Sequence, residues 1–150
     1  MAGHQAMTGG GRLAVGIGCR TGARPEAVVD LVRRCLSAAG ATEAAGAGVA
    51  LFTVQDKVQE PGLGEAAVRL GLPLVFLPRA LLEAASAGAE TRSERVVALF
   101  GVPSVAETAA LAGAGPGARL VVPRIAGDGV TCAVARLPAA GAPDRAGEAP

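Results

Sequence analysis

The chain has 150 residues, a net charge of +1, a hydrophobic fraction of 51% and only three aromatic residues, all phenylalanine. This length suits a single domain, and the near-neutral charge excludes a general electrostatic attraction to nucleic acid or to an anionic membrane surface. The scarcity of aromatic rings also argues against a platform for stacking nucleic-acid bases. We therefore expect one domain with a core of small aliphatic side chains.

Residues that commonly bind metals or form catalytic triads are scarce. The cysteines at 19, 35 and 132 are too widely spaced for a zinc motif or a disulfide framework. The single histidine, His4, lies outside the predicted domain, so we expect no histidine-based triad or metal site. No apolar run is long enough to span a bilayer, and the first residues lack the apolar segment of a signal peptide. We expect a cytoplasmic protein without a resident metal or cofactor.

Strands and helices alternate in the first half of the chain. Short apolar runs bounded by glycine or proline predict strands, and apolar residues at helical spacing predict helices. In chain order we expect a strand at 13–17, a loop at 18–22, a helix from Pro25 that Gly40 ends, a strand at 48–54, a helix at 63–70 that Gly71 ends, a strand at 74–77 and a helix at 81–85.

The second half predicts further helices and then a hairpin. Ser104 and Glu107 have the spacing of a capping box, in which each side chain bonds the other residue's backbone N–H. Gly127-Asp128-Gly129 is a hairpin turn signal. We expect a short helix that begins near Ser93 and contains Phe100, a helix after Ser104 that Gly113 ends, and strands at 120–125 and 130–136.

This pattern predicts the fold class. Alternating strands and helices favour right-handed parallel units, and the hairpin adds an antiparallel pair. We expect a three-layer α/β/α domain over residues 12–137, with a mixed, mostly parallel sheet of about five strands. Residues 1–11 are rich in glycine and polar residues, and residues 138–150 are rich in glycine and proline. Both segments are predicted to be disordered tails.

The strongest local signal is a glycine-rich segment between the first strand and the first helix, with glycines at 16, 18 and 22. Glycine lets backbone amides approach an anion, and the following helix N-terminus favours negative charge. Arg20 adds a guanidinium suited to a carboxylate or a phosphate. The spacing matches neither the dinucleotide fingerprint nor a Walker A loop. Two interpretations stay open: an anion-binding loop, or a tight turn that needs glycine for backbone reasons alone.

Cys19 lies inside this segment. A helix N-terminus and Arg20 would both favour its thiolate, which makes Cys19 a candidate nucleophile. However, no histidine base lies in the predicted domain, so packing at the end of a strand is the favoured interpretation. Cys35 and Cys132 are expected to belong to the core.

A second candidate segment runs from Thr53 to Glu60. Ligands of open α/β sheets bind beyond the carboxyl ends of the strands, so this segment and the glycine-rich segment are expected to share one edge. Lys57 is the only lysine in the chain. Glu60 is predicted to orient Lys57 or to act as a general acid or base; the alternative is a solvated loop with an incidental ion pair. Arg124 and Thr131, near the hairpin, are weaker candidates for an anion contact and a ligand floor.

Five stretches follow one another in an order and spacing that agree with a known family. They are Gly16-Ile-Gly-Cys-Arg-x-Gly22, Thr53-x-x-x-Lys57-x-x-Glu60-Pro-Gly-Leu63, Leu70-Gly-Leu-Pro-Leu74, Gly101-Val-x-Ser-Val-Ala-Glu107 and Gly129-Val-Thr-x-Ala-Val-Ala-Arg136. In these stretches the chain resembles the CobE/CbiG C-terminal domain family of cobalamin biosynthesis. Two departures are Gln55, where aspartate is common in the family, and Arg124, where lysine is usual.

The resemblance implies an α/β domain that acts on or holds a precorrin-type macrocycle. In two-domain members it implies opening of the ring-A δ-lactone of cobalt-precorrin-5A, with loss of a two-carbon unit as acetaldehyde. This chain looks like the C-terminal domain alone, so both a hydrolase and a non-catalytic carrier remain open, as do partners among other cobalamin-pathway enzymes. An alternative from another class is a small nucleotide- or phosphate-binding domain that uses the Gly16–Gly22 loop.

Under this resemblance the candidate residues divide into two groups. Lys57 and Glu60 are the candidates for chemistry: the lysine would grip a carboxylate, and the glutamate would hold the lysine or move a proton. The remaining candidates would contact the ligand. They are Gly16, Gly18, Cys19, Arg20, Gly22, Thr53, Arg124 and Thr131.

Overall fold

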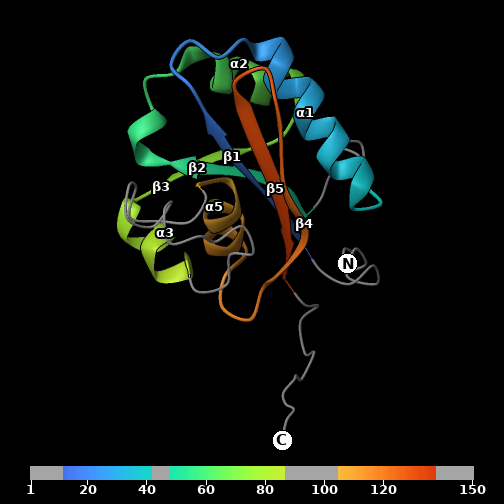
Figure 1. Ribbon diagram of the computed structural model, residues 1–150, viewed down its shortest axis with the longest axis vertical. Helices are drawn as coiled ribbons and strands as arrows, with labels where there is room; N and C mark the ends of the chain where they lie inside the picture. The colour runs from blue at the N-terminus through green and yellow to red at the C-terminus, as the bar shows by residue number, and fades with distance from the viewer. Residues whose placement is uncertain (1–11, 42–47, 87–104, 138–150) are drawn as a thin grey trace, which may run out of the picture.

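The computed structural model describes residues 12–41, 48–86 and 105–137, which form one sheet flanked by helices (Figure 1). The elements are β1 (Leu13–Cys19), α1 (Pro25–Ala38), β2 (Val49–Val54), the 3₁₀ helix η3 (Gln55–Lys57), α2 (Pro61–Leu70), β3 (Leu74–Leu77), α3 (Arg79–Ala85), α5 (Val105–Ala114), β4 (Arg119–Gly127) and β5 (Val130–Arg136). The predicted tails, the helix near Ser93 and the capping residue Ser104 lie outside the described residues.

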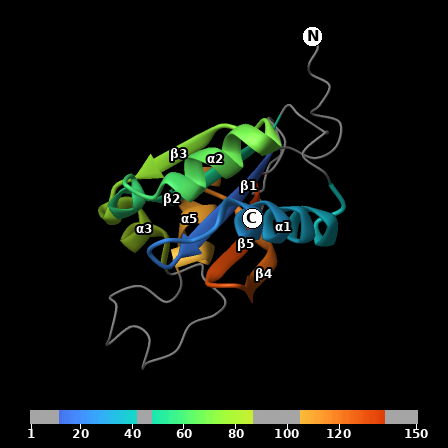
Figure 2. The same ribbon diagram turned by 90° about the horizontal axis from the view of Figure 1, so that it is seen from above.

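The five strands have the order β3-β2-β1-β5-β4, with β1 at the centre. Strands β1, β2 and β3 are parallel, β5 is antiparallel to β1, and β4 pairs with β5 as a hairpin. Helices α1 and α2 pack on one face, and α3 and α5 pack on the other (Figures 1 and 2). The predicted three-layer α/β class, the mixed five-stranded sheet and the C-terminal hairpin are confirmed.

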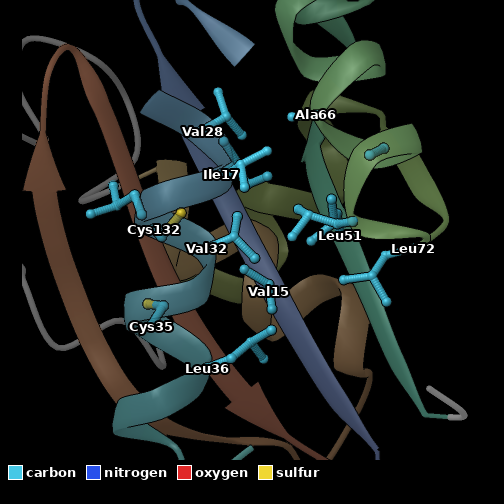
Figure 3. Close-up of a cluster of buried hydrophobic side chains, with 14 of the residues drawn as sticks. Val15, Ile17, Val28, Val32, Cys35, Leu36, Leu51, Ala66, Leu72 and Cys132 are labelled. Atoms are coloured by element: carbon cyan, nitrogen blue, oxygen red, sulfur yellow. The ribbon is translucent and has the colours of Figure 1, made fainter. Parts of the chain in front are cut away.

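The larger part of the core lies between α1 and the sheet. Pro25 occupies the first turn of α1, where its missing N–H costs nothing, and Glu26 suits the positive end of the helix dipole. Side chains of α1 such as Val28 and Val32 meet Val15 and Ile17 of β1, all with 0% exposure (Figure 3). Burial of aliphatic side chains stabilises this face by about 25 cal/mol per Å² of apolar surface.

The opposite face depends on contact between main chains. A Cβ atom added to Gly16 would lie 1.9 Å from the carbonyl oxygen of Ala106 and 2.5 Å from the amide nitrogen of Ala110. Helix α5 therefore packs directly on the backbone of β1, which only glycine permits. Gly16 and Gly18 both lie inside β1, so the loop begins two residues later than predicted, and the backbone interpretation of Gly16 is the one that the structure supports.

The turn between β4 and β5 is the one that the sequence predicts. Asp128 has φ 52° and Gly129 has φ 80°, the left-handed values that a two-residue type I′ turn requires. This turn places the tip of the hairpin at the same end of the sheet as the carboxyl end of β1, because Val130 pairs with Cys19.

None of the described helices is both long enough and apolar enough to cross a lipid bilayer.

The contact at Gly16 gives a testable prediction. Gly16→Ala is expected to lower the free energy of unfolding by about 3 kcal/mol, the upper end of the range typical of an overpacked core. The cost is this high because the main chains of β1 and α5 cannot move apart as a side chain could. Gly64→Ala is the matched control: nothing lies within 4 Å of the added methyl group in the middle of α2. It should stabilise the protein by about 0.5–1 kcal/mol. Urea unfolding followed by circular dichroism measures both; similar values for the two variants would contradict the proposed contact.

Candidate functional site

The loops after β1 and β2 meet at the carboxyl edge of the sheet, as predicted. The backbone N–H of Gly22 donates to Oε1 of Glu60 at 2.8 Å, joining residues 38 positions apart. Glu60 is also the N-cap residue of α2, directly before its first residue Pro61. The carboxylate therefore fixes the distance between the two loops.

This bond changes the interpretation of both residues. The predicted contact between Glu60 and Lys57 is not formed: Lys57 has no ion pair or hydrogen bond of its side chain within the part of the chain that the structure describes. The Gly22 amide, predicted to face an external anion, is occupied by a carboxylate of the protein itself. With Gly16 packed under α5, fewer amides than expected are available for a phosphate, which weighs against the nucleotide-binding alternative.

Cys19 is the last residue of β1 and lies near the charges of Lys57 and Glu60. Burial raises the pKa of the Cys19 thiol above its ordinary value; the positive charge of Lys57 lowers this pKa, and the negative charge of Glu60 raises it. Lys57, in the loop after β2, is thus close enough to affect the pKa of the Cys19 thiol. The three influences together raise the pKa of the thiol and so favour its neutral form. This supports the interpretation of Cys19 as a packing residue over its interpretation as a nucleophile.

Thr53 and Thr131 bind main chain on either side of β1. The Thr53 hydroxyl donates to the carbonyl of Ile17 at 2.7 Å and is fully buried. The Thr131 hydroxyl donates to the carbonyl of Gly18 at 3.3 Å from the adjacent strand β5. Both threonines therefore fix the carboxyl end of β1, and Thr53 lies beneath the surface that a ligand would reach.

Arg20 is fixed by the tip of the hairpin. Its backbone N–H donates to the carbonyl of Gly129 at 3.0 Å. The aliphatic stem of Arg20 crosses Gly129, whose added Cβ would lie 3.5 Å from Cδ of the arginine. The guanidinium makes no side-chain hydrogen bond or ion pair with any described residue. Arg20 and Lys57 are therefore two cations, one from each loop, with no anionic partner in the described structure.

Arg124 is connected to the other face of the sheet. Its backbone N–H donates to Oε2 of Glu107 at 3.0 Å, and it makes no hydrogen bond with either loop in the described ranges. The pairing of β4 with β5 is irregular between Val122 and Ile125, and Pro123 within this stretch has no N–H. The structure thus places Arg124 at an irregularity of β4, beside Glu107 of α5, and it shows no contact of Arg124 with Arg20 or Lys57 in the described ranges.

The structural role of Glu107 was not predicted from the sequence. Glu107 is fully buried in α5 and accepts the Arg124 N–H, whereas the sequence suggested only a capping role. Two signals could have identified it. Glu107 is the only charged residue in an otherwise small and apolar helix, and Pro123 inside a strand signals a bulge with an unpaired neighbour.

The other two cysteines belong to the core, as predicted. Cys35 of α1 and Cys132 of β5 are both buried, with 0% exposure, in the core between this helix and the sheet (Figure 3). Among the residues in the three described ranges, no three His, Cys, Asp or Glu side chains come together to hold a metal ion.

Comparison with known proteins decides the family. Residues 13–135 match the family described as Cobalamin synthesis G C-terminus. The chain belongs to this family. It is 36% identical over 134 residues to Protein CobE of Sinorhizobium sp, covering 88% of this chain and 86% of that protein. The resemblance drawn from the five sequence stretches is therefore confirmed, and the chain is a protein of cobalamin biosynthesis.

Solved structures agree with this assignment. A crystal structure of CobE, a protein from the cobalamin (vitamin B12) biosynthetic pathway, is 34% identical and superposes with a TM-score of 0.74, covering 84% of this chain and 93% of that one. The cobalamin biosynthesis protein chiG of Agrobacterium tumefaciens is 39% identical with a TM-score of 0.64, over 83% and 97% of the two chains. Both relatives are matched over nearly their whole length, so the three proteins share this single α/β domain.

The charges around Cys19 predict opposite effects of two substitutions. Lys57→Ala removes a cation and should raise the pKa of the Cys19 thiol further, slowing its alkylation by iodoacetamide at pH 8–9. Glu60→Gln removes an anion, keeps an oxygen for the Gly22 N–H, and should lower this pKa and speed the reaction. Mass spectrometry of the Cys19 peptide measures both rates, with Arg69→Ala as a remote charge control. Changes of the same sign would refute the arrangement.

The buried carboxylate of Glu107 predicts a graded loss of stability. Glu107→Ala leaves the Arg124 N–H without its acceptor, which should cost about 1–3 kcal/mol in the free energy of unfolding. Glu107→Gln retains an acceptor oxygen and should lose less. Urea unfolding measures both values, and an equal loss in the two variants would show that the hydrogen bond to Arg124 contributes little.

Proposed function

We propose that this protein binds a carboxylate-bearing precorrin or corrin-ring intermediate of cobalamin biosynthesis at the carboxyl edge of its sheet. The site comprises the loop after β1, the loop after β2 and the tip of the β4–β5 hairpin. Corrin precursors carry several acetate and propionate side chains. Their recognition therefore requires cations around an open surface more than it requires a deep polar cavity.

The observation that carries this proposal is the pair of unpartnered cations at the edge. Arg20 directly follows Cys19 in the loop after β1, and Lys57 in the loop after β2 is close enough to lower the pKa of the Cys19 thiol, yet neither cation forms an ion pair within the described ranges. Arg79, at the start of α3, is by contrast paired with Asp56. Cations without a partner at a surface built by three segments are suited to the carboxylates of a ligand.

The geometry favours holding the ligand over hydrolysing it. The Glu60 carboxylate, the candidate base, accepts the Gly22 N–H and joins two loops. The Cys19 thiol is kept neutral by burial. A carrier that protects an intermediate and delivers it to another enzyme of the pathway is consistent with both facts. Lactone opening with release of acetaldehyde is the second version of the proposal, and the experiment below separates the two.

Titration of the purified protein with hydrogenobyrinic acid, followed by absorbance, tests the proposal. We expect a saturable spectral shift. Arg20→Ala and Lys57→Ala should each weaken binding about fivefold, the equivalent of roughly 1 kcal/mol for a partly exposed charge. Arg69→Ala is the matched control, because it removes the same charge from a cation already paired with Glu65 and Glu26.

Three outcomes would change the conclusion. No saturable shift with the wild-type protein, or equal weakening by all three substitutions, would refute a site at this edge. A lactone-containing cobalt-precorrin, incubated with the protein and assayed for acetaldehyde, separates carrier from hydrolase: release of acetaldehyde would establish turnover and overturn the carrier version.

A further inference from the structure

A hollow of about 430 Å³ lies between the loop after β1 and the tip of the hairpin. These two segments are more than a hundred residues apart in the sequence, and they are the two that β1 and β5 bring to the same end of the sheet (Figure 1). The hollow contains both arginines of the loop and the acidic residue of the turn. Its lining residues are Arg20, Thr21, Gly22, Ala23, Arg24, Asp128 and Gly129.

One ion pair bridges this hollow. Nη2 of Arg24 lies 3.1 Å from Oδ2 of Asp128, and the two side chains are 63% and 70% exposed. An ion pair so open to water is weak, because solvent screens the attraction and two long side chains must be held in place. The carboxylate of Asp128 is therefore readily replaced on Arg24 by another carboxylate.

Arg20 stands in the same hollow without an acidic partner in the described structure. Its backbone is held by the hydrogen bond to Gly129, and its stem lies across this glycine. The hollow thus combines one free guanidinium with one that is held by a weak internal carboxylate. A ligand that brings two neighbouring carboxylates would satisfy both arginines.

We propose that this hollow is a carboxylate subsite in which an acetate- or propionate-type group of the ligand displaces Asp128 from Arg24. Asp128 acts as an internal stand-in for the ligand. The identity of the full ligand rests on the proposed function; the subsite itself rests only on the arginines, the exposed ion pair and the hollow. Displacement exchanges one ion pair for another and forms no covalent bond.

Asp128 offers a clean substitution. Its φ of 52° belongs to the type I′ turn, and asparagine occupies this turn position at least as well as aspartate. Asp128→Asn therefore keeps the hairpin and removes the competing charge. If Asp128 is a stand-in, removing it should strengthen ligand binding, which is the opposite of what is expected for a residue that supports the site.

The experiment uses two probes on the full chain. Tricarballylate, a small tricarboxylate, is titrated while the amide signals of Gly22 and Gly129 are followed by NMR, and hydrogenobyrinic acid is titrated by absorbance. We expect Asp128→Asn to bind both probes about two- to fivefold more tightly than the wild type. Arg24→Gln should bind both more weakly. Glu65→Gln, which removes an acid from the Arg69 ion pair on α2, is the matched control and should change neither affinity.

The outcomes separate the subsite from the proposed function. Weaker or unchanged binding of tricarballylate by Asp128→Asn, or no shift of Gly22 and Gly129 with the wild type, would overturn the subsite. Tricarballylate binding that Asp128→Asn strengthens, without any binding of hydrogenobyrinic acid, would support the subsite and refute the corrinoid ligand. Circular dichroism of each variant confirms that the hairpin and the fold are retained.

Discussion

Direct packing of α5 on the main chain of β1 is the contact on which the rest of the structure depends. Because Gly16 has no side chain, the helix backbone approaches the central strand to a distance that any Cβ would forbid. The contact holds β1, the central strand of the sheet, against α5, while α1 packs on its other face. The loops after β1 and β2, and the hairpin that pairs with β1 through β5, then converge at the carboxyl end of β1.

The converging segments are held together by a few polar contacts that involve main chain. Glu60 accepts the Gly22 N–H, Arg20 donates its N–H to Gly129, and Thr53 and Thr131 bind carbonyls of β1. Main-chain partners have fixed positions, so these bonds set the shape of the edge. Among the described residues, the charged ends of Arg20 and Lys57 form no ion pair or side-chain hydrogen bond, and they are the cations on which the proposed carboxylate site depends.

The sequence predicted local features well where one residue type decides a conformation. Pro25 and Glu26 marked the start of α1, Gly71 ended α2 in the left-handed region, and Asp128-Gly129 formed the expected turn. It did not predict the partner of Glu60, because a carboxylate three residues from a lysine is equally suited to bond it or to point elsewhere. Nor did it predict that Glu107 would be buried, since its acceptor role depends on an irregularity in a strand that follows much later.

The sequence by itself determined the family, the α/β class and the edge at which the loops after β1 and β2 meet, because these follow from periodicity, turn residues and five motifs in order. Only the tertiary structure decided which charges are neutralised. In the folded chain Arg24 forms an ion pair with Asp128, 104 residues away, and the Gly22 N–H donates a hydrogen bond to Glu60. Arg20 and Lys57 have no acidic partner in the described ranges. The physical reason is that ion pairs and hydrogen bonds depend on distances of a few ångströms between segments remote in sequence, which no local pattern encodes.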